Sequence, residues 1–510
     1  MLLQARTGAS ARERSGPARW SSEASTEIWI LGGLVVLAAV LRFATISSQS
    51  YWLDESQAAH ELGLSFGAML RAWNAAEWNP PLYLILAWPW AKVFGTGEAG
   101  LRSLSALLGV GLIPLLYLAG RELVSGRAGL VAAALAAVNP FMIDYSGEAR
   151  EYMLLVVLCT ASMLFFARTW RRGATRDLVW WGVFSALALL TQYFAGFLVA
   201  AEGLLLVWRL RSRASVIALV AQAVVLAPLI PHVIPRFGEK AAFITEQGLV
   251  TRIQQVPVAF GLDTLFKSPA VTYGLLGAAA LAAVVIALLI IGADDRQLRG
   301  AGLAAVLAAA VLLLPLGLAL TGHDDYIARG LMPAWPPLAV VIGAACTAPG
   351  AKLPGAALVG VLVAGFLWAG LKINSDAYYQ RPDWRAVAAQ LGTHTGTRAI
   401  VAYDGQFATG PLSFYLRGVP WSGPGAAPGT DSGPVTIDEL DVVGDRGQPL
   451  GPLTGGIRRL SGRDVDGYLV YRFKLPRPVT MTPAEIQARA MALLGYGGTL
   501  VPPMIQRTSA

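Results

Sequence analysis

The chain has 510 residues, of which 55% are hydrophobic and only 14% are charged. This balance excludes an ordinary soluble domain and predicts a polytopic membrane protein. The net charge of +8 does not indicate a nucleic-acid-binding protein, because the arginines stand in short clusters between apolar runs. Such clusters are typical of loops on the cytoplasmic side of a membrane. The two cysteines, Cys159 and Cys346, lie inside apolar runs and predict neither a disulfide framework nor a metal site.

The N-terminal segment, residues 1–27, is polar and contains several arginines. The apolar run that follows it lacks a convincing small-residue cleavage site. We therefore expect an uncleaved signal anchor, with residues 1–27 as a cytoplasmic tail and a first span over roughly residues 28–46.

A long outer loop, about residues 47–100, follows the first span. Five of its apolar residues recur at helical spacing: Leu62, Phe66, Met69, Leu70 and Trp73. This spacing predicts an amphipathic helix on the membrane surface. The apolar stretch that ends at Phe94 is about 20 Å long as a helix, shorter than the roughly 30 Å hydrocarbon core. We expect this stretch to dip into the membrane without crossing it.

Ten further apolar runs predict spans, which makes eleven in all. Their approximate ranges are 101–120, 128–145, 152–167, 178–191, 194–208, 214–231, 271–292, 301–320, 331–348 and 354–371. With this count, every arginine cluster falls on the side of the N-terminus and the long loops fall on the opposite side. The transmembrane region is therefore expected to cover residues 28–371.

Residues 372–510 are polar and rich in glycine and proline, which predicts an extracytoplasmic domain. A helix is expected to begin near Asp383, and residues 399–403 and 468–473 have the composition of strands. Thr482 and Glu485 form a capping box before a helix that continues to about residue 494. We expect a small α/β domain.

The most unusual polar stretch follows the first span directly. It reads Tyr51-Trp52-Leu53-Asp54-Glu55, with His60 and Glu61 a few residues further on. Charges placed at the end of a span are costly, which favours a functional role. The alternative is a solvated helix cap that begins at Asp54.

This stretch is the first of five that resemble a known family. The others are residues 79–83, 98–105 with 121–123, 139–152 and 326–337. In order and spacing they resemble the bacterial polyprenol-phosphate-sugar-dependent glycosyltransferases of the GT-C superfamily, which include protein O-mannosyltransferases and aminoarabinose transferases of lipid A. The resemblance covers roughly residues 30–345 and, more loosely, the helix at Asp383. One departure is Asn79, where the family usually has histidine.

The resemblance implies inverting, metal-independent transfer of a sugar from a polyprenyl-phosphate donor to an envelope lipid, glycan or protein. The reaction is expected on the outer face of the cytoplasmic membrane. It needs a base for the acceptor and cations for the departing phosphate. Asp54 matches the family's catalytic base. Glu55 is expected to orient Asp54 or to hold the acceptor, and a carboxylate in the first turn of a helix is the alternative.

The candidates for contacting the donor phosphate are Arg150, Arg329, Lys92 and Tyr152. The two arginines stand singly at outer helix ends, against the positive-inside trend. The alternatives are interfacial snorkelling and ion pairs with Glu148 or Asp325.

Four more residues are candidates for contacting substrate: Tyr193, Asn79, His60 and Glu61. A divalent metal is an alternative for His60 with Glu61, and for the run from His323 to Asp325. No cofactor is expected. Glu202, a carboxylate inside a predicted span, is either structural or faces the donor cavity.

Two other functions compete with the glycosyltransferase. A transporter or flippase of lipid-linked sugars predicts several charges at the membrane midplane and inverted repeats. Here the polar residues gather on one side, and no repeat is evident. A non-catalytic scaffold is the third hypothesis, and the presence of Asp54, Arg150 and Arg329 together argues against it.

Overall fold

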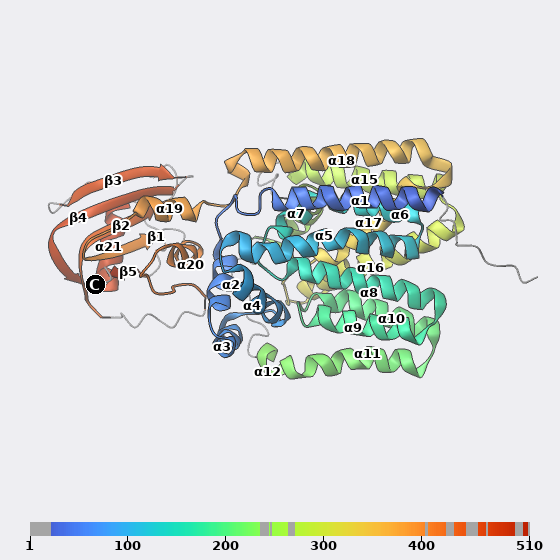
Figure 1. Ribbon diagram of the computed structural model, residues 1–510, viewed down its shortest axis with the longest axis horizontal. Coiled ribbons are helices and arrows are strands. Elements are labelled where there is room, and N and C mark those ends of the chain that lie inside the picture. Colours follow the sequence, from blue (N-terminus) through green and yellow to red (C-terminus); the bar gives the residue numbers. More distant parts are fainter. Residues whose placement is uncertain are drawn as a thin grey trace, which may run out of the picture.

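The computed structural model describes residues 22–234, 244, 247–263, 271–402, 406–424, 433–444, 457–465, 468–494 and 503–507. The predicted tail up to residue 21 and most of the Gly/Pro-rich stretch before residue 433 lie outside this part. The described chain forms a long bundle of helices with a small sheet domain at one end (Figure 1).

The long helices of the bundle run roughly along its long axis, and shorter ones join them (Figure 1). These are α1 (Ser22–Phe43), α5 (Glu98–Leu123), α6 (Gly126–Val138), α7 (Pro140–Ser146), α8 (Tyr152–Arg172), α9 (Thr175–Leu189), α10 (Ala195–Leu210), α11 (Arg213–Leu226), η1 (Ala227–Leu229), α12 (Ile230–Val233), α14 (Leu249–Leu262), α15 (Val271–Gly292), α16 (Asp295–Leu320), η4 (Met332–Ala334), α17 (Trp335–Cys346), η5 (Pro349–Ala351) and α18 (Lys352–Ser375). Each predicted span corresponds to one of these helices or to adjoining ones.

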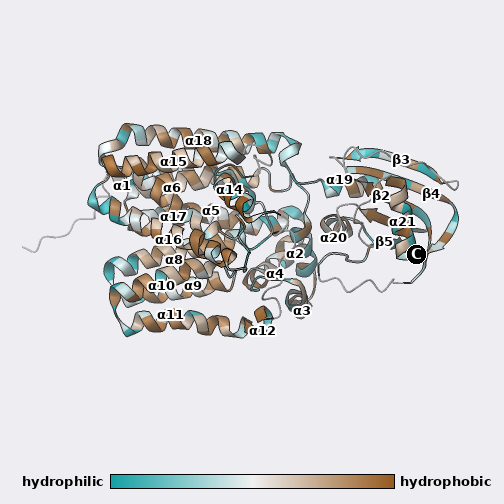
Figure 2. Cartoon of the chain, turned by 180° about the vertical axis from the view of Figure 1, so that it is seen from behind, coloured by the Kyte–Doolittle hydropathy of each residue, from teal (hydrophilic) through white to brown (hydrophobic). Residues whose placement is uncertain are grey.

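Seven described helices are long and apolar enough to cross a membrane, or eight if the bent pair of α6 and α7 counts as one span. Apolar residues cover most of the bundle, whereas the sheet domain is mixed (Figure 2). The protein is therefore a membrane protein, with the predicted polytopic helical fold. The predicted number of eleven spans stays a prediction, because α9 and α10 have only 15 and 16 residues.

The predicted helix over residues 128–145 is not continuous. It bends by 61° between α6 and α7. Asn139 caps α7 by accepting a hydrogen bond from the Met142 amide at 3.0 Å, and Pro140 has no amide hydrogen with which to continue the first helix. The bend makes α7 a separate short helix, and the chain continues from its end into the connection to α8.

Three short helices lie between the bundle and the sheet domain (Figure 1). They are α2 (Leu53–Gly63), α3 (Phe66–Ala76) and α4 (Leu82–Phe94). The single amphipathic helix expected here is thus two helices, because the chain is extended at Leu64 and Ser65. The short apolar stretch that ends at Phe94 forms the helix α4, and its dip into the membrane stays a prediction.

The sheet domain confirms the predicted α/β character of the C-terminal part. Its strands are β1 (Thr397–Ala402), β2 (Val435–Gly444), β3 (Arg458–Val465), β4 (Tyr468–Met481) and β5 (Met504–Arg507), in the order β3-β4-β2-β1-β5. Only β1 and β2 pair in parallel. Three helices complete the domain: α19 (Trp384–Leu391), α20 (Gln406–Tyr415) and α21 (Pro483–Leu494). Asp383 caps α19, and the predicted capping box of Thr482 and Glu485 precedes α21.

Hydrogen bonds join the sheet domain to the segment just before α2 and to the start of α5. The Tyr415 hydroxyl donates to Glu98 at 2.5 Å and accepts from the Tyr51 amide at 2.7 Å. Gly410 lets α20 approach α2 closely, because a Cβ there would lie 2.7 Å from a methyl carbon of Leu53. These contacts fix the position of the polar stretch that begins at Tyr51.

Candidate active site

Asp54 lies in the first turn of α2, next to Arg329. An Asp54 carboxylate oxygen is 3.4 Å from Nη1 of Arg329, and the two side chains are 23% and 22% exposed. The rings of Trp52 and Tyr152 lie 5.8 and 6.0 Å from this guanidinium. A carboxylate and a cation, both reachable from solvent, thus face each other beside aromatic side chains, and the structure brings together Asp54, Arg329 and Tyr152 from the sequence prediction.

Glu55, the neighbour of Asp54, is fully buried and pairs with a different arginine. Both of its oxygens accept hydrogen bonds from Arg102 at 2.7 Å, and one also accepts from the Ala149 amide at 2.9 Å. Burial raises the pKa of Glu55, but Arg102 outweighs this effect and holds the pKa below its ordinary value. Glu55 is therefore ionised and anchors the first turn of α2, which suits a positioning role for Asp54.

Arg150 is largely enclosed by carboxylates. It donates to Glu77 at 2.7 and 3.1 Å, and its Nε lies 3.1 Å from an oxygen of Glu151. Asn79 belongs to the same network and donates to Glu151 at 2.8 Å. Neither Arg150 nor Asn79 lines the cavity described below. A phosphate contact through Arg150 and a substrate contact through Asn79 stay predictions.

Lys92 forms hydrogen bonds at the C-terminal end of α2. Its Nζ donates to the carbonyl oxygens of Leu62, Gly63 and Leu64 at 3.1 to 3.4 Å. This places Lys92 at the opposite end of α2 from Asp54. A contact between Lys92 and the donor phosphate stays a prediction.

The other three candidates for contacting substrate, His60, Glu61 and Tyr193, lie in different surroundings. His60 stacks on Trp421 of the sheet domain, with ring centroids 4.4 Å apart. Glu61 is buried and accepts from Gln57 at 3.1 Å, and burial, followed by the charge of Glu77, raises the pKa of Glu61 to about 8. Tyr193 lies in the turn between α9 and α10. Their contacts with substrate stay predictions.

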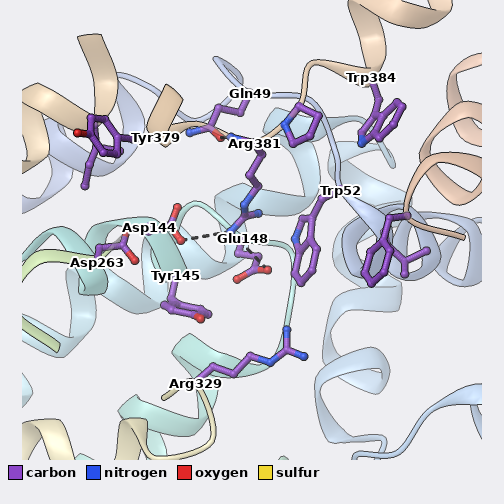
Figure 3. Close-up of a pocket in the computed structure, with 14 residues that line it drawn as sticks. Gln49, Trp52, Asp144, Tyr145, Glu148, Asp263, Arg329, Tyr379, Arg381 and Trp384 are labelled. Carbon is purple, nitrogen blue, oxygen red and sulfur yellow. Dashed lines mark hydrogen bonds and ion pairs between the residues drawn. The ribbon is translucent and has the colours of Figure 1, made fainter. Parts of the chain in front are cut away.

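A cavity of about 270 Å³ lies beside Arg329. Figure 3 shows its polar lining, which includes Trp52, Asp144, Tyr145, Glu148, Arg329 and Arg381. These residues come from four places: the start of α2, the α7–α8 region, the segment that follows α16 and the segment that follows α18. The cavity is the place where a ligand can reach Arg329.

Arg381 was not a candidate in the sequence analysis. Its guanidinium lies 3.2 Å from Asp144, 3.4 Å from Glu55 and 3.6 Å from Glu148. It also lies 5.0 Å from the ring of Trp52. The signal that pointed to Arg329 was available here too, because Arg381 is a single arginine just beyond the last predicted span.

Glu148 is fully buried, and its carboxyl group points into the cavity between Arg381 and Arg329 (Figure 3). Burial raises the pKa of Glu148 to about 8, although Arg381 acts in the opposite direction. Neither carboxyl oxygen accepts a hydrogen bond from any described residue. Among the described residues, no group of three or more His, Cys, Asp or Glu side chains is arranged to hold a metal ion.

Glu202 lies far from this cavity along the chain, inside α10. It is fully buried and accepts hydrogen bonds from Trp181 at 2.8 Å and from Ser162. These partners belong to α9 and α8, so the carboxylate links three helices. This arrangement favours the structural role of Glu202 over a place on a transport path.

A family model described as dolichyl-phosphate-mannose-protein mannosyltransferase matches residues 79–234. A comparison with curated proteins finds no match. Among solved structures, the chain is similar to ArnT from Cupriavidus metallidurans bound to undecaprenyl phosphate, with 16% identity and a TM-score of 0.51 over 87% of this chain and 98% of that chain. This likeness shows that the two chains share a fold.

Two further solved structures are similar at lower scores. One is the Archaeoglobus fulgidus oligosaccharyltransferase in the apo form, with 13% identity and a TM-score of 0.40 over 72% of this chain and 58% of that chain. The other is the S. cerevisiae protein O-mannosyltransferase Pmt1-Pmt2 complex bound to the sugar donor, with 19% identity and a TM-score of 0.32 over 48% of this chain and 36% of that chain.

Proposed function

We propose that this chain, a glycosyltransferase of the GT-C superfamily, transfers a sugar from a polyprenyl-phosphate donor to an acceptor in the cell envelope. The observation that carries the proposal is the accessible pair of Asp54 and Arg329 at a cavity that also contains Arg381. A carboxylate base and cations for a phosphate are the groups that this reaction needs. The matched mannosyltransferase family and the undecaprenyl phosphate bound to ArnT support a lipid-linked donor.

The donor phosphate binds to Arg329. A guanidinium can donate two parallel hydrogen bonds to a phosphate, and it keeps its charge at all physiological pH values. Nη1 of Arg329 lies 3.4 Å from one Asp54 oxygen, which is longer than a typical hydrogen bond between charged groups. When a phosphate oxygen replaces the Asp54 oxygen as the partner of Arg329, the carboxylate of Asp54 becomes available to the acceptor.

Asp54 then accepts the proton of the acceptor hydroxyl or amine. The acceptor atom forms a bond to the anomeric carbon of the sugar, and the bond between that carbon and the phosphate oxygen breaks. Polyprenyl phosphate leaves with the bonding electrons, and the anomeric configuration is inverted. Glu55 acts indirectly, because its bonds to Arg102 and the Ala149 amide hold the turn that carries Asp54.

Loss of the protein is expected to remove one sugar-sized mass increment from an envelope lipid, glycan or protein, as measured by mass spectrometry of envelope fractions. The parental gene should restore the increment and Asp54→Asn should not, because a transferase needs the base. Purified parent in lipid vesicles should also release undecaprenyl phosphate from its sugar-bearing form when that envelope fraction is added. Restoration by Asp54→Asn, without release of undecaprenyl phosphate by the parent, would instead support the lipid transporter.

The proposal places the site and the sheet domain outside the cytoplasm. A membrane-impermeant maleimide added to intact cells is expected to label Thr436→Cys in the sheet domain and not Thr175→Cys at the start of α9. Both positions are exposed, and the native Cys159 and Cys346 are buried, so background labelling should be low. Thr175→Cys should react only after permeabilisation. Labelling of both from the same side would contradict an odd number of spans between them and the site's outer location.

A further inference from the structure

The cavity contains polar groups that the proposed reaction does not use. The carboxyl oxygens of Glu148 and the indole nitrogen of Trp52 are buried, and none of them has a hydrogen-bond partner among the described residues. Both residues line the cavity. Buried polar groups are nearly always hydrogen-bonded, so unpaired ones that face a cavity indicate a missing partner.

We propose that Glu148 and Trp52 bind the sugar of the donor, with the carboxyl group of Glu148 hydrogen-bonded to sugar hydroxyls and the indole N–H of Trp52 donating to another. This assignment rests on the proposed function and makes it more specific. It gives the cavity two parts: Arg329 for the phosphate, and Glu148 with Trp52 for the sugar attached to that phosphate.

The geometry supports this division. Glu148 lies between Arg381 and Arg329, and its carboxyl group faces the same space as the Arg329 guanidinium (Figure 3). A sugar joined directly to a phosphate on Arg329 must occupy the space next to it. The cavity of about 270 Å³ lies just below the roughly 300–1,000 Å³ of typical small-molecule sites, which suits a group of the size of one sugar residue.

The chemistry of the lining also favours a neutral polyhydroxyl ligand. Asp144 disfavours a second anion there, and the two arginines disfavour a free cation. Burial raises the pKa of Glu148 to about 8, although Arg381 acts in the opposite direction, so this carboxyl group takes up a proton more readily than an ordinary glutamate. A protonated carboxyl group both donates and accepts, as a hydroxyl partner requires. Trp52 and Tyr145 add aromatic walls for the carbon–hydrogen faces of the ring.

The test compares lipid phosphates with and without a sugar. Purified parent and Glu148→Leu are titrated with undecaprenyl phosphate and with undecaprenyl phosphates that carry a mannosyl, glucosyl or arabinosyl group. The parent is expected to bind at least one sugar-bearing lipid more tightly than the bare phosphate. Glu148→Leu should lose roughly 10-fold of the affinity for that lipid and bind undecaprenyl phosphate like the parent.

Two further variants separate binding from folding. Glu148→Gln keeps a donor and an acceptor and should recover most of the affinity, while Trp52→Phe keeps a ring without the N–H and should lose about 3- to 10-fold. If Glu148→Leu does not fold, these two variants still decide the question. Glu202→Gln, at a buried carboxylate inside the bundle, is the matched control and should bind both lipids like the parent.

Three results would overturn the assignment. The first is unchanged binding of every sugar-bearing lipid by Glu148→Leu and Trp52→Phe. The second is a parent that does not distinguish sugar-bearing lipids from the bare phosphate. The third is a Glu148→Leu variant with a higher KM for the acceptor and an unchanged affinity for the donor. That result would mean that Glu148 and Trp52 bind an acceptor hydroxyl. Failure of the proposed function differs from all three, because Arg329→Ala would then bind bare undecaprenyl phosphate like the parent.

Discussion

Asp54→Asn is expected to lower the turnover of sugar transfer by roughly 10²–10⁴-fold, the usual contribution of a positioned base. Asparagine keeps the size of the side chain but cannot accept the proton of the acceptor. Donor affinity should stay the same or rise slightly, because Arg329 loses the carboxylate that now lies 3.4 Å away. Initial rates of transfer and titration with undecaprenyl phosphate measure the two effects separately.

Asp376→Asn is the matched control for this change. Asp376 pairs with Lys372 at the end of α18, is about one-third exposed and does not line the cavity, so its variant should turn over at the parental rate. A parental rate in Asp54→Asn would place the base elsewhere, with Glu55 as the next candidate. An Asp54→Asn protein that neither folds nor binds donor would support the helix-cap alternative.

Arg329→Ala is expected to cost about 2.7–4 kcal/mol of transition-state stabilisation, by analogy with loss of one donor to a developing anion. The loss should appear in donor affinity as well as in turnover, because the same guanidinium holds the phosphate before and during the reaction. Arg329→Lys should recover only part, since lysine lacks the bidentate fork. Transfer rates and undecaprenyl phosphate binding are the measurements. Arg299→Ala, at a highly exposed arginine in α16, should change neither.

Arg150→Ala provides a contrast with Arg329→Ala. It leaves Glu77 and Glu151 as buried carboxylates without their cation, a change that typically costs about 3–5 kcal/mol of stability. We therefore expect a lower thermal midpoint for Arg150→Ala and a nearly parental midpoint for Arg329→Ala. Parental donor affinity and turnover in Arg329→Ala would remove Arg329 from the proposed site.

The fold could be predicted from the sequence wherever a local pattern determines it. The long apolar runs predicted the helices of the bundle, and the caps at Asp383 and Thr482 predicted where α19 and α21 begin. The bend at Asn139 was missed, although the sequence Asn139-Pro140 contains both its cap and its helix breaker. Because residues 128–145 are mostly apolar, hydrophobicity alone predicted one continuous helix.

The described strands β2, β3 and β5 were not predicted, and the first two of them show why. The middle strand β2 contains the buried Glu439 and Asp441, which local composition assigns to the surface. Their partners, Arg472 and Arg398, lie 33 and 43 residues away in the chain. The edge strand β3 is mostly exposed and has no alternation of apolar residues. Strand formation here depends on pairing with distant segments, which no short window contains.

The residues of the site also divide into those that local sequence patterns indicate and those that only the folded chain brings together. Asp54 and Arg329 are 275 residues apart, and family-like motifs pointed to both. Glu148 lies within the family-like stretch 139–152, but nothing in that stretch gave it a role, and the signal for Arg381 was its place as a single arginine just beyond the last predicted span. Their proximity depends on the path of the chain after α18, which returns Arg381 to the α7–α8 connection.

The late position of Arg381 has a consequence for how the protein is made. Glu55 can pair with Arg102 after 47 more residues have been synthesised, but its second cation, Arg381, follows 326 residues later. At about 5–20 residues per second, that interval is about 16–65 s on the ribosome. Asp144 precedes Arg381 by 237 residues. From their own synthesis until that of Arg381, Asp144 and Glu148 lack the arginine that contacts both in the finished protein. The nascent chain therefore lacks this part of the ion-pair network until residue 381 has been synthesised, and a chain truncated before residue 381 leaves these carboxyl groups without that cation.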